Sequence, residues 1–272
     1  MPENVVIARS ELGLIIHGTY PSPSVLSIVS NELQGSNIGL AILDPPYGNI
    51  LSETWDKVGA IKPFVRRMLH WVSVTGKLME KDSALLLWGG IGIENFRPLY
   101  LFLAHVEQKT DFSIANHITW SKKRAYGVSH NYLFTREELI YMTKGNPKTP
   151  RVFNIPLLKE IRGYPGYNSK YPAKSPYKRR TNVWTDATEL FKDKLHPAQK
   201  PNTVYEVIIQ THSNVEDIIL DPFAGSGVTG EVATQLGRRF ILVENDLNSF
   251  KIICNRLKAR MYTSYGKELK ND

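Results

Sequence analysis

Short apolar runs that end at an acidic residue constrain the fold of this chain more than any other feature of its sequence. The segments IGLAILD (38–44), DIILD (217–221) and RFILVE (239–244) have the composition of buried strands. Amphipathic stretches with helical periodicity alternate with these and other apolar runs, and the chain carries no internal repeat. This alternation is typical of a largely parallel sheet with flanking helices, so the sequence predicts an α/β fold.

The predicted elements form two α/β regions separated by a segment of different composition. The first region, 1–148, is expected to hold strands at 14–17, 38–44, 83–89, 114–120 and 138–144, and helices at 23–34, 61–79 and 94–109. The last region, 183–272, is expected to hold strands at 217–221 and 239–244, and helices at 203–212, from about 228, and at 246–261. These elements predict a single nucleotide-binding sheet divided between the two regions.

The segment between them, 149–182, is basic and irregular. From Thr149 to Thr181 it holds eight lysine or arginine residues and the single acid Glu160. Proline, glycine and tyrosine are scattered through it with little periodicity, which predicts an inserted, loop-rich module. Its tyrosines lie among the basic residues, and this mixture suits contacts to the grooves, phosphates and displaced bases of nucleic acid.

The overall composition favours a nucleic-acid partner and excludes other classes. Lysine and arginine number 34 against 26 acidic residues, which gives a net charge of +8 and a pI near 9.4 and favours a polyanionic partner. Cys254 is the only cysteine, so a disulfide framework is excluded, no metal site is expected and a reducing, cytoplasmic setting is indicated. No targeting segment or membrane-spanning apolar run is found, so a soluble protein is expected.

A glycine-rich turn follows the strand 217–221. In PFAGSGVTG, Gly225, Gly227 and Gly230 have the spacing of a dinucleotide-binding fingerprint between a strand and a helix. Glu244 ends the next strand, where its carboxylate can accept hydrogen bonds from both hydroxyls of an adenosine ribose. The alternative is an ordinary strand-to-helix turn beside a solvated acid. A phosphate-binding P-loop fits poorly, because no Lys-Ser or Lys-Thr pair follows the glycines.

A second motif, DPPYG (44–48), follows the strand 38–44 at the kind of strand end where α/β sheets bind ligands. Its two prolines fix φ and remove two backbone donors, which leaves the Asp44 carboxylate and the Pro45 carbonyl as acceptors on a stiff support. This acceptor-rich arrangement suits an amino group, and Tyr47 offers a face on which a planar base can stack. The alternative is a proline-rich turn in which Tyr47 only packs.

With these motifs in place, the chain resembles the beta group of DNA amino-methyltransferases. In that group the target-base motif precedes the recognition region and the cofactor motif follows it. Here DPPYG, LHPAQKP (195–201), ILDPFAGSGVTG (219–230) and RRFILVE (238–244) occur in this order, and the resemblance covers roughly 38–145 and 183–260. One departure is Gly18-Thr19, where the family often has Gly-Asp with the acid facing the cofactor adenine.

The resemblance implies a Rossmann-like methyltransferase sheet with flanking helices and a small basic inserted target-recognition region at 149–182, between a catalytic half (1–148) and a cofactor-binding half (183–272). It implies that S-adenosylmethionine is the cofactor. The implied catalytic residues are Asp44, Pro45, Pro46 and Tyr47. The implied cofactor-binding residues are His196, Gln199, Lys200, Pro201, Asp221, Pro222, Phe223, Ala224, Gly225, Ser226, Gly227, Glu244 and Asn245, with Lys200 near the methionine moiety of the cofactor.

The expected reaction starts with a base flipped out of the duplex. Asp44 and the Pro45 carbonyl then hold its amino group while the nitrogen attacks the methyl group directly. Asp rather than Ser at the first motif position resembles adenine-N6 enzymes, so N6 of adenine in DNA is the predicted acceptor. Cytosine C5 methylation is rejected, because it needs a thiolate and Cys254 lies in an apparent core helix.

Several alternatives stay open at this point. Cytosine N4 in DNA and adenine N6 in RNA would use the same acceptor chemistry, and a catalytically silent nucleic-acid-binding subunit could keep the fold. A nicotinamide-dependent dehydrogenase shares the glycine pattern, but it gives DPPYG no role. Double-stranded DNA is the predicted partner, with a homodimer and a cognate restriction endonuclease as further partners considered. The predicted DNA contacts are Lys122, Lys123, Arg124, Lys178, Arg179 and Arg180.

Overall fold

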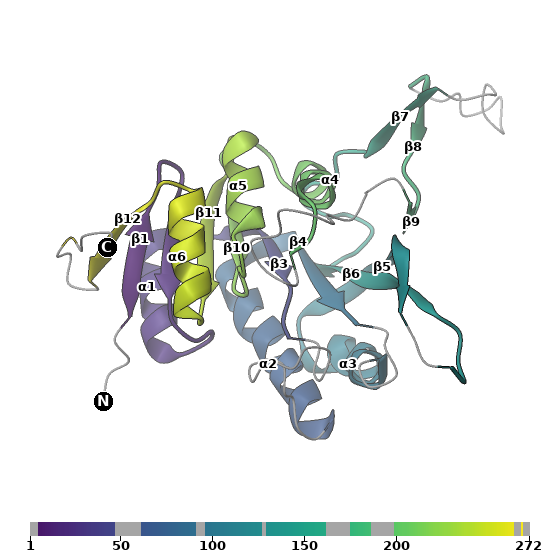
Figure 1. Ribbon diagram of the computed structural model, residues 1–272, viewed down its shortest axis with the longest axis horizontal. Helices are drawn as coiled ribbons and strands as arrows, with labels where there is room; N and C mark the ends of the chain where they lie inside the picture. Colours follow the sequence, from purple (N-terminus) through teal and green to yellow (C-terminus); the bar gives the residue numbers. More distant parts are fainter. Residues whose placement is uncertain are drawn as a thin grey trace.

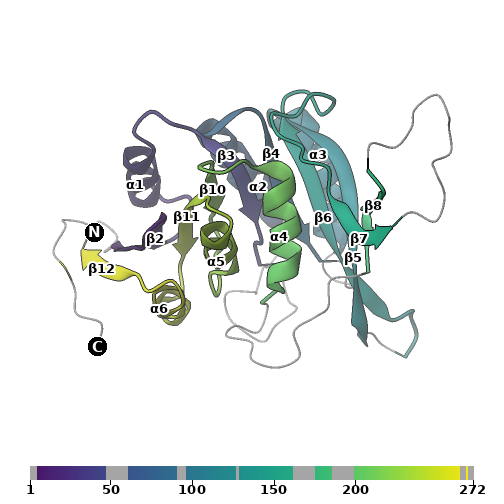
Figure 2. The ribbon, with the colours of Figure 1, turned by 90° about the horizontal axis from the view of Figure 1, so that it is seen from above.

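A computed structural model describes residues 5–46, 61–90, 96–126, 129–161, 175–185, 199–263 and 268. Within these residues the chain forms a ten-stranded mixed sheet with helices on both faces, and a separate two-stranded sheet (Figures 1 and 2). None of the described helices is long and apolar enough to span a bilayer.

Five adjacent parallel strands form the centre of the main sheet. Their order across the sheet is β2 (Gly13–His17), β11 (Arg239–Glu244), β10 (Ile218–Asp221), β3 (Ile38–Leu43) and β4 (Met79–Gly89). All six residues of β3 are buried, as expected for a parallel strand covered on both faces. The predicted division of one sheet between the two ends of the chain is confirmed, because β10 pairs with β3 and β11 with β2.

The sheet is extended at both sides by strands that run in other directions. Beyond β4, the strand β6 (Phe134–Lys144) pairs antiparallel with β4 and with β5 (Phe112–Tyr126), and β9 (Val183–Trp184) pairs parallel with β5. Beyond β2, β1 (Val6–Arg9) lies antiparallel between β2 and β12 (Arg260–Thr263). The two ends of the described chain therefore meet at one edge of the sheet.

Alternate side chains of the central strands point to opposite faces and so build two cores. On β3, Leu40 and Ile42 belong to one apolar cluster, whereas Ala41 and Leu43 belong to the other. Figure 2 shows the helices on the two faces. The first face is covered by α4 (Asn202–His212), α5 (Val228–Gln235) and α6 (Leu247–Arg256), and the second by α1 (Pro23–Leu33), α2 (Ile61–Leu78) and α3 (Phe96–Lys109).

The predicted helix over 246–261 is wrong beyond Arg256. The helix α6 ends at Arg256, Lys258 adopts a left-handed backbone with φ 50°, and β12 begins at Arg260. The peptide N–H of Ala259 donates to the carbonyl of Cys254 and closes the helix end (2.8 Å). Pairing with β1 thus overrides the helical pattern of the sequence in this segment.

The basic insert contains regular structure that its composition did not predict. Its strands β7 (Leu157–Ile161) and β8 (Tyr177–Arg179) pair antiparallel, with Leu157 opposite Arg179 and Ile161 opposite Tyr177. In Figure 1 this small sheet lies next to β9, at the end of the main sheet that β5 and β9 form.

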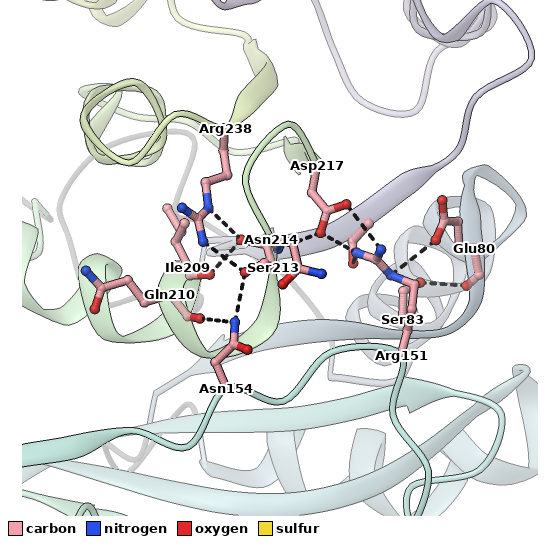
Figure 3. Close-up of polar contacts among 11 residues, drawn as sticks. Glu80, Ser83, Arg151, Asn154, Ile209, Gln210, Ser213, Asn214, Asp217 and Arg238 are labelled. Carbon is pink, nitrogen blue, oxygen red and sulfur yellow. Dashed lines mark hydrogen bonds and ion pairs between the residues drawn. The ribbon is translucent and has the colours of Figure 1, made fainter.

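The first residues of the insert are fastened to the amino ends of the central strands (Figure 3). Arg151 donates to the Asp217 carboxylate, which precedes β10 (2.5 and 3.1 Å), and pairs with Glu80 at the start of β4 (3.1 Å). Three residues later, the Asn154 amide donates to the carbonyls of Gln210 (2.9 Å) and Ser213 (3.2 Å) at the end of α4. These contacts hold the first residues of the insert at the amino ends of the parallel strands, on the opposite side of the sheet from their carboxyl ends.

Candidate active site

The acids singled out in the sequence lie together at the carboxyl ends of the central strands. Asp44 directly follows β3, Asp221 ends β10 and Glu244 ends β11, and these three strands are adjacent and parallel. In an open α/β sheet this edge is where ligands bind. The neighbouring β2 ends beside it, because the Gly18 peptide N–H donates to the Glu244 carbonyl (2.9 Å). Thr19, which stands where the family often has Asp, is exposed next to this position.

Glu244 organises the glycine-rich turn through its buried carboxylate. One oxygen accepts the peptide N–H of Gly225 (2.7 Å) and the other accepts that of Asp246 (2.8 Å). Gly225 (φ 54°) and Gly227 (φ 79°) adopt left-handed backbone, which a residue with a side chain rarely does. Burial raises the pKa of Glu244 above its ordinary range. Each carboxylate oxygen retains acceptor capacity, so the site can still receive two hydroxyl donors.

The third glycine of the motif lets α5 approach the sheet closely. A Cβ atom at Gly230 would lie 2.8 Å from side-chain carbons of both Leu242 and Leu257. Such distances are far shorter than van der Waals contact, so no larger residue fits without displacing its neighbours. The third glycine of a dinucleotide fingerprint serves this kind of close helix-to-strand packing.

Asp221 ties the turn to the first residues of α5. Its carboxylate accepts the Phe223 peptide N–H (3.0 Å) and the Thr229 hydroxyl (2.5 Å), and the residue is only 2% exposed. Burial raises the pKa of Asp221 to about 7, although the two hydrogen bonds act in the opposite direction. Through these two hydrogen bonds the buried Asp221 carboxylate fixes the shape of the turn.

The end of the 195–201 segment joins the two halves of the site. The Ser226 hydroxyl in the glycine-rich turn donates to the Gln199 side-chain oxygen (3.2 Å), and Pro201 directly precedes α4. Arg256 on α6 donates to the Ser226 carbonyl (2.8 Å) and also pairs with Glu231 (2.9 Å). Sequence reasoning did not single out Arg256. The sequence signalled it only as a basic residue within the predicted helix 246–261, and the structure places it in the last turn of α6.

Lys200 is the residue of this segment that reaches the catalytic motif. Its ammonium contacts the Asp44 carboxylate, lies 3.4 Å from a Glu137 oxygen and stands over the Trp88 ring, 4.6 Å from the centroid. Its side chain is 4% exposed. Burial alone would lower the pKa of Lys200, but Asp44 and Glu137 outweigh burial and raise it. The resemblance had placed Lys200 near the cofactor, and nothing in the sequence had singled out Glu137 or Trp88.

Glu137 also contacts a second cation, the Lys122 ammonium, which stands 5.5 Å from the centroid of the Trp120 ring. Burial alone would raise the pKa of Glu137, whereas Lys200 and Lys122 lower it, so this carboxylate is charged. Two acids and two lysines therefore form one ion network. It extends from the catalytic motif to β5 and β6.

The remaining predicted site residues lie around this centre. Pro45 and Ala224 are buried and Asn245 is exposed, while Tyr47 and His196 lie outside the described residues.

The basic residues of the insert have local partners, since Lys178 pairs with Glu160 (2.6 Å) and Arg179 lies over the Phe153 ring. Arg180 lies over the ring of Trp184 on β9. Lys123 and Arg124 continue β5 beyond Lys122. A role in binding DNA stays a prediction for all six basic residues.

Comparison with known proteins gives consistent matches. A family model described as DNA methylase, of N6 and N4 methyltransferases, matches residues 38–255. The Type II methyltransferase M2.DpnII of Streptococcus pneumoniae is 27% identical over 253 residues, which cover 86% of this chain and 87% of that protein. The relative M2.LlaDCHI of Lactococcus lactis subsp. cremoris is 28% identical over 245 residues, covering 83% and 84% of the two chains.

Two solved structures share the fold. A complex of M1.HpyAVI with S-adenosylmethionine (SAM) aligns with a TM-score of 0.60 and 23% identity, over 89% of this chain and 98% of that one. The cytosine-N4-specific PvuII DNA methyltransferase aligns with a TM-score of 0.67 and 16% identity, over 91% and 86%. The family match includes Asp44, the glycine-rich turn and Glu244 within one stretch. The chain accordingly belongs to the N6 and N4 DNA methylases, a family of SAM-dependent DNA methyltransferases.

Proposed function

We propose that this chain methylates the N6 amino group of adenine at a specific sequence in double-stranded DNA, after the base has flipped out of the duplex. The observation that carries the proposal is the position of Asp44. Its carboxylate, followed by two prolines, lies at the same sheet edge as Glu244 and the glycine-rich turn. An acceptor for an amino group and a site for an adenosine-containing cofactor thus lie on adjacent parts of one edge.

The chemistry of the turn fits the cofactor. The Glu244 carboxyl group offers acceptor oxygens to ribose hydroxyls, and the left-handed glycines Gly225 and Gly227 remove side chains from the ligand's approach. When bound, S-adenosylmethionine supplies an electrophilic methyl group on a sulfonium. Gln199 steadies the turn through Ser226, so the segment 199–201 supports the same site.

Asp44 and Pro45 hold the amino group in this proposal. Hydrogen bonds from the two amine hydrogens to the Asp44 carboxylate and the Pro45 carbonyl localise the nitrogen lone pair and stabilise positive charge that develops on nitrogen. Lys200 contacts the Oδ2 atom of Asp44, and a carboxylate has several lone pairs to offer to further donors. The ring of Pro45 fixes its φ and the following Pro46 restricts its ψ, so the Pro45 carbonyl needs little reorganisation.

Adenine is favoured as the base because the motif begins with Asp, as in the adenine-N6 enzymes that the chain resembles. Cytosine N4 is the second candidate, favoured by the fold similarity to PvuII DNA methyltransferase at a TM-score of 0.67. The acceptor pair serves either amino group. Adenine N6 in RNA is the corresponding alternative substrate class.

The insert is proposed to bind the target DNA. Lys178 and Arg179 are exposed on β8, and Tyr177 on the same strand is 44% exposed. Exposed cations suit phosphates and exposed aromatic rings suit bases. The relatives are named Type II methyltransferases, so we extend the proposal to a restriction endonuclease as a functional partner and to action in the cytoplasm.

The test is transfer of labelled methyl from S-adenosylmethionine to mixed-sequence duplex DNA and to RNA, followed by nucleoside mass analysis. N6-methyladenine in DNA is the expected product. N4-methylcytosine in DNA would show that cytosine is the target base, and label found only in RNA would show that RNA is the substrate. No label in either pool would refute the proposal.

Two variants separate the two parts of the site. Asp44→Ala should abolish transfer and leave S-adenosylmethionine affinity nearly unchanged. Glu244→Gln should weaken that affinity by about tenfold or more, since hydrogen bonds to a charged acceptor are worth roughly 1.5–3 kcal/mol. Equal loss of cofactor affinity in both variants would contradict this division of roles.

A further inference from the structure

We propose that Glu137 is a positioning residue for methyl transfer, which acts by sharing the Lys200 ammonium with Asp44. The inference rests on the proposed function, because it assigns Asp44 the amino group of the target base. Glu137 is not expected to touch the substrate. It controls how strongly Lys200 engages the acceptor that does.

The geometry places Lys200 between two carboxylates. The end of β3 contributes Asp44, and β6 contributes Glu137, whose oxygen lies 3.4 Å from the Lys200 ammonium. The Trp88 ring on β4 lies under the same ammonium at 4.6 Å. The Lys200 side chain is 4% exposed, so water contributes little to stabilising its charge. Within these surroundings the two acids are the groups that balance it.

The charges around this ammonium come from several elements. Lys122 on β5 contacts Glu137, so the network of Asp44, Glu137, Lys200 and Lys122 has no net charge. Tyr205 on α4 lies within electrostatic reach of Asp44 and Glu137, and burial raises the pKa of this phenol well above its ordinary value, so it stays neutral. Among the described residues, Asp44 and Glu137 are thus the two carboxylates shown in contact with Lys200.

The consequence for the reaction follows from the charge that develops on the amine. An ammonium held by Asp44 alone draws electron density from the carboxylate and opposes positive charge on the attacking nitrogen. A lysine has three N–H donors, and Glu137 can take one of them together with part of the ionic attraction. Asp44 is then a stronger acceptor for the amine hydrogens. Without the Glu137 charge, Lys200 is expected to engage Asp44 fully.

The alternative is that Glu137 only stabilises the pairing of β5 with β6. The two roles are separated by retaining or removing the charge. Glu137→Gln keeps the shape and removes the charge, whereas Glu137→Asp keeps the charge on a shorter side chain. Glu138→Gln is the matched control, because Glu138 is the next buried acid of β6 and contacts His117 (2.8 Å), Arg136 (3.1 Å) and Thr119 instead.

The experiment measures single-turnover methyl transfer with saturating DNA and S-adenosylmethionine, the cofactor affinity, and the thermal midpoint of each variant. Glu137→Gln is expected to lower the transfer rate about 10- to 100-fold with cofactor affinity unchanged. Glu137→Asp should retain the rate within about threefold, and Glu138→Gln should match the wild type. Equal losses in Glu137→Gln and Glu137→Asp, or a wild-type rate in Glu137→Gln, would overturn the inference.

A double-variant cycle tests whether Glu137 acts through Lys200. Residues that act through one another give non-additive effects, whereas independent residues add. In a Lys200→Met background, Glu137→Gln should change the transfer rate less than about twofold. Additive losses would refute the coupling. If the wild-type chain transfers no methyl group, the proposed function fails first, whereas an active wild type with an insensitive Glu137 refutes only this inference.

Discussion

His212 makes the stability of this fold sensitive to acid in a predictable way. The residue lies at the end of α4 and is 4% exposed, with its ring packed against those of Tyr141 (centroids 4.3 Å apart) and Phe153 (5.5 Å). Its Nδ1 atom has no hydrogen-bond partner among the described residues. Burial lowers the pKa of His212 from 6.5 to about 3, so the folded chain holds a neutral imidazole.

The sign of the effect follows from proton linkage. Below pH 6.5 the unfolded chain binds a proton at His212 that the folded chain does not. The free energy of unfolding therefore has its full His212 contribution above pH 6.5 and decreases as the pH falls from 6.5 towards 3. Each pH unit in this window costs about 1.4 kcal/mol, so the free energy of unfolding at pH 5 should be about 2 kcal/mol lower on account of His212. His212→Phe replaces the ring with one that cannot titrate and should remove this loss.

The assay is urea unfolding followed by tryptophan fluorescence at pH 7.5 and pH 5.0. The difference between the two pH values should be about 2 kcal/mol smaller in His212→Phe than in the wild type. His105→Gln is the control, because His105 is exposed on α3 and its loss should leave the difference unchanged. Equal acid sensitivity in His212→Phe and the wild type would refute the reasoning.

Other parts of the structure give shorter tests. Gly230→Ala should destabilise the fold by about 1–3 kcal/mol in urea unfolding, because its Cβ would lie 2.8 Å from Leu242, and a wild-type midpoint would contradict that packing. Cys254→Ala should keep the methyl-transfer rate, since burial raises the pKa of this thiol to about 11, and a large loss of rate would point to thiol chemistry. Arg151→Met leaves the Asp217 carboxylate without its cation and should lower the free energy of unfolding by about 2 kcal/mol, measured in urea, whereas no change would show that the contact is replaced by water.

The central strands were predictable because their signals are local. The segments predicted at 38–44, 217–221 and 239–244 differ from β3, β10 and β11 by one residue or none at each end. Each is a continuous apolar run bounded by turn residues, and burial on both faces leaves little competition from other structures. The helix α2 also has a local signal in its helical periodicity, and it was expected at 61–79 and spans 61–78.

The outer strands β1 and β12 could not be predicted from local sequence patterns. β1 and β12 were not predicted, because each is four residues long and is defined by pairing across the length of the chain. The left-handed backbone at Lys258 ends the last helix without a glycine to mark it. Likewise, the pairing of β7 with β8 joins residues about twenty positions apart, with no alternation in the sequence to signal it.

The site shows the same division between local and distant contacts. The turn from Asp221 to Gly227 and Glu244 lie within one short stretch, so spacing alone indicated a glycine-rich turn with an acid at the next strand end, although not the hydrogen bonds that join them. The contact between Lys200 and Asp44 joins residues 156 positions apart. Glu137 approaches the same ammonium from a third region of the chain. Sequence patterns supply the chemistry of such residues, but only the folded sheet brings their charges together.

The anchoring of the insert has a consequence for how such a protein can diversify. Its entry is held by Arg151 and Asn154, and its exit by β9, where Val183 and Trp184 pair with β5. Between these two fixed points, the described residues 155–161 and 175–182 contribute no strand to the main sheet. They can therefore be exchanged as a cassette for those of another member of the fold. If the insert binds the target DNA as proposed, a chimera of this kind would take on the recognition sequence of the donor while keeping its own transfer machinery, so specificity could evolve without change to the catalytic sheet.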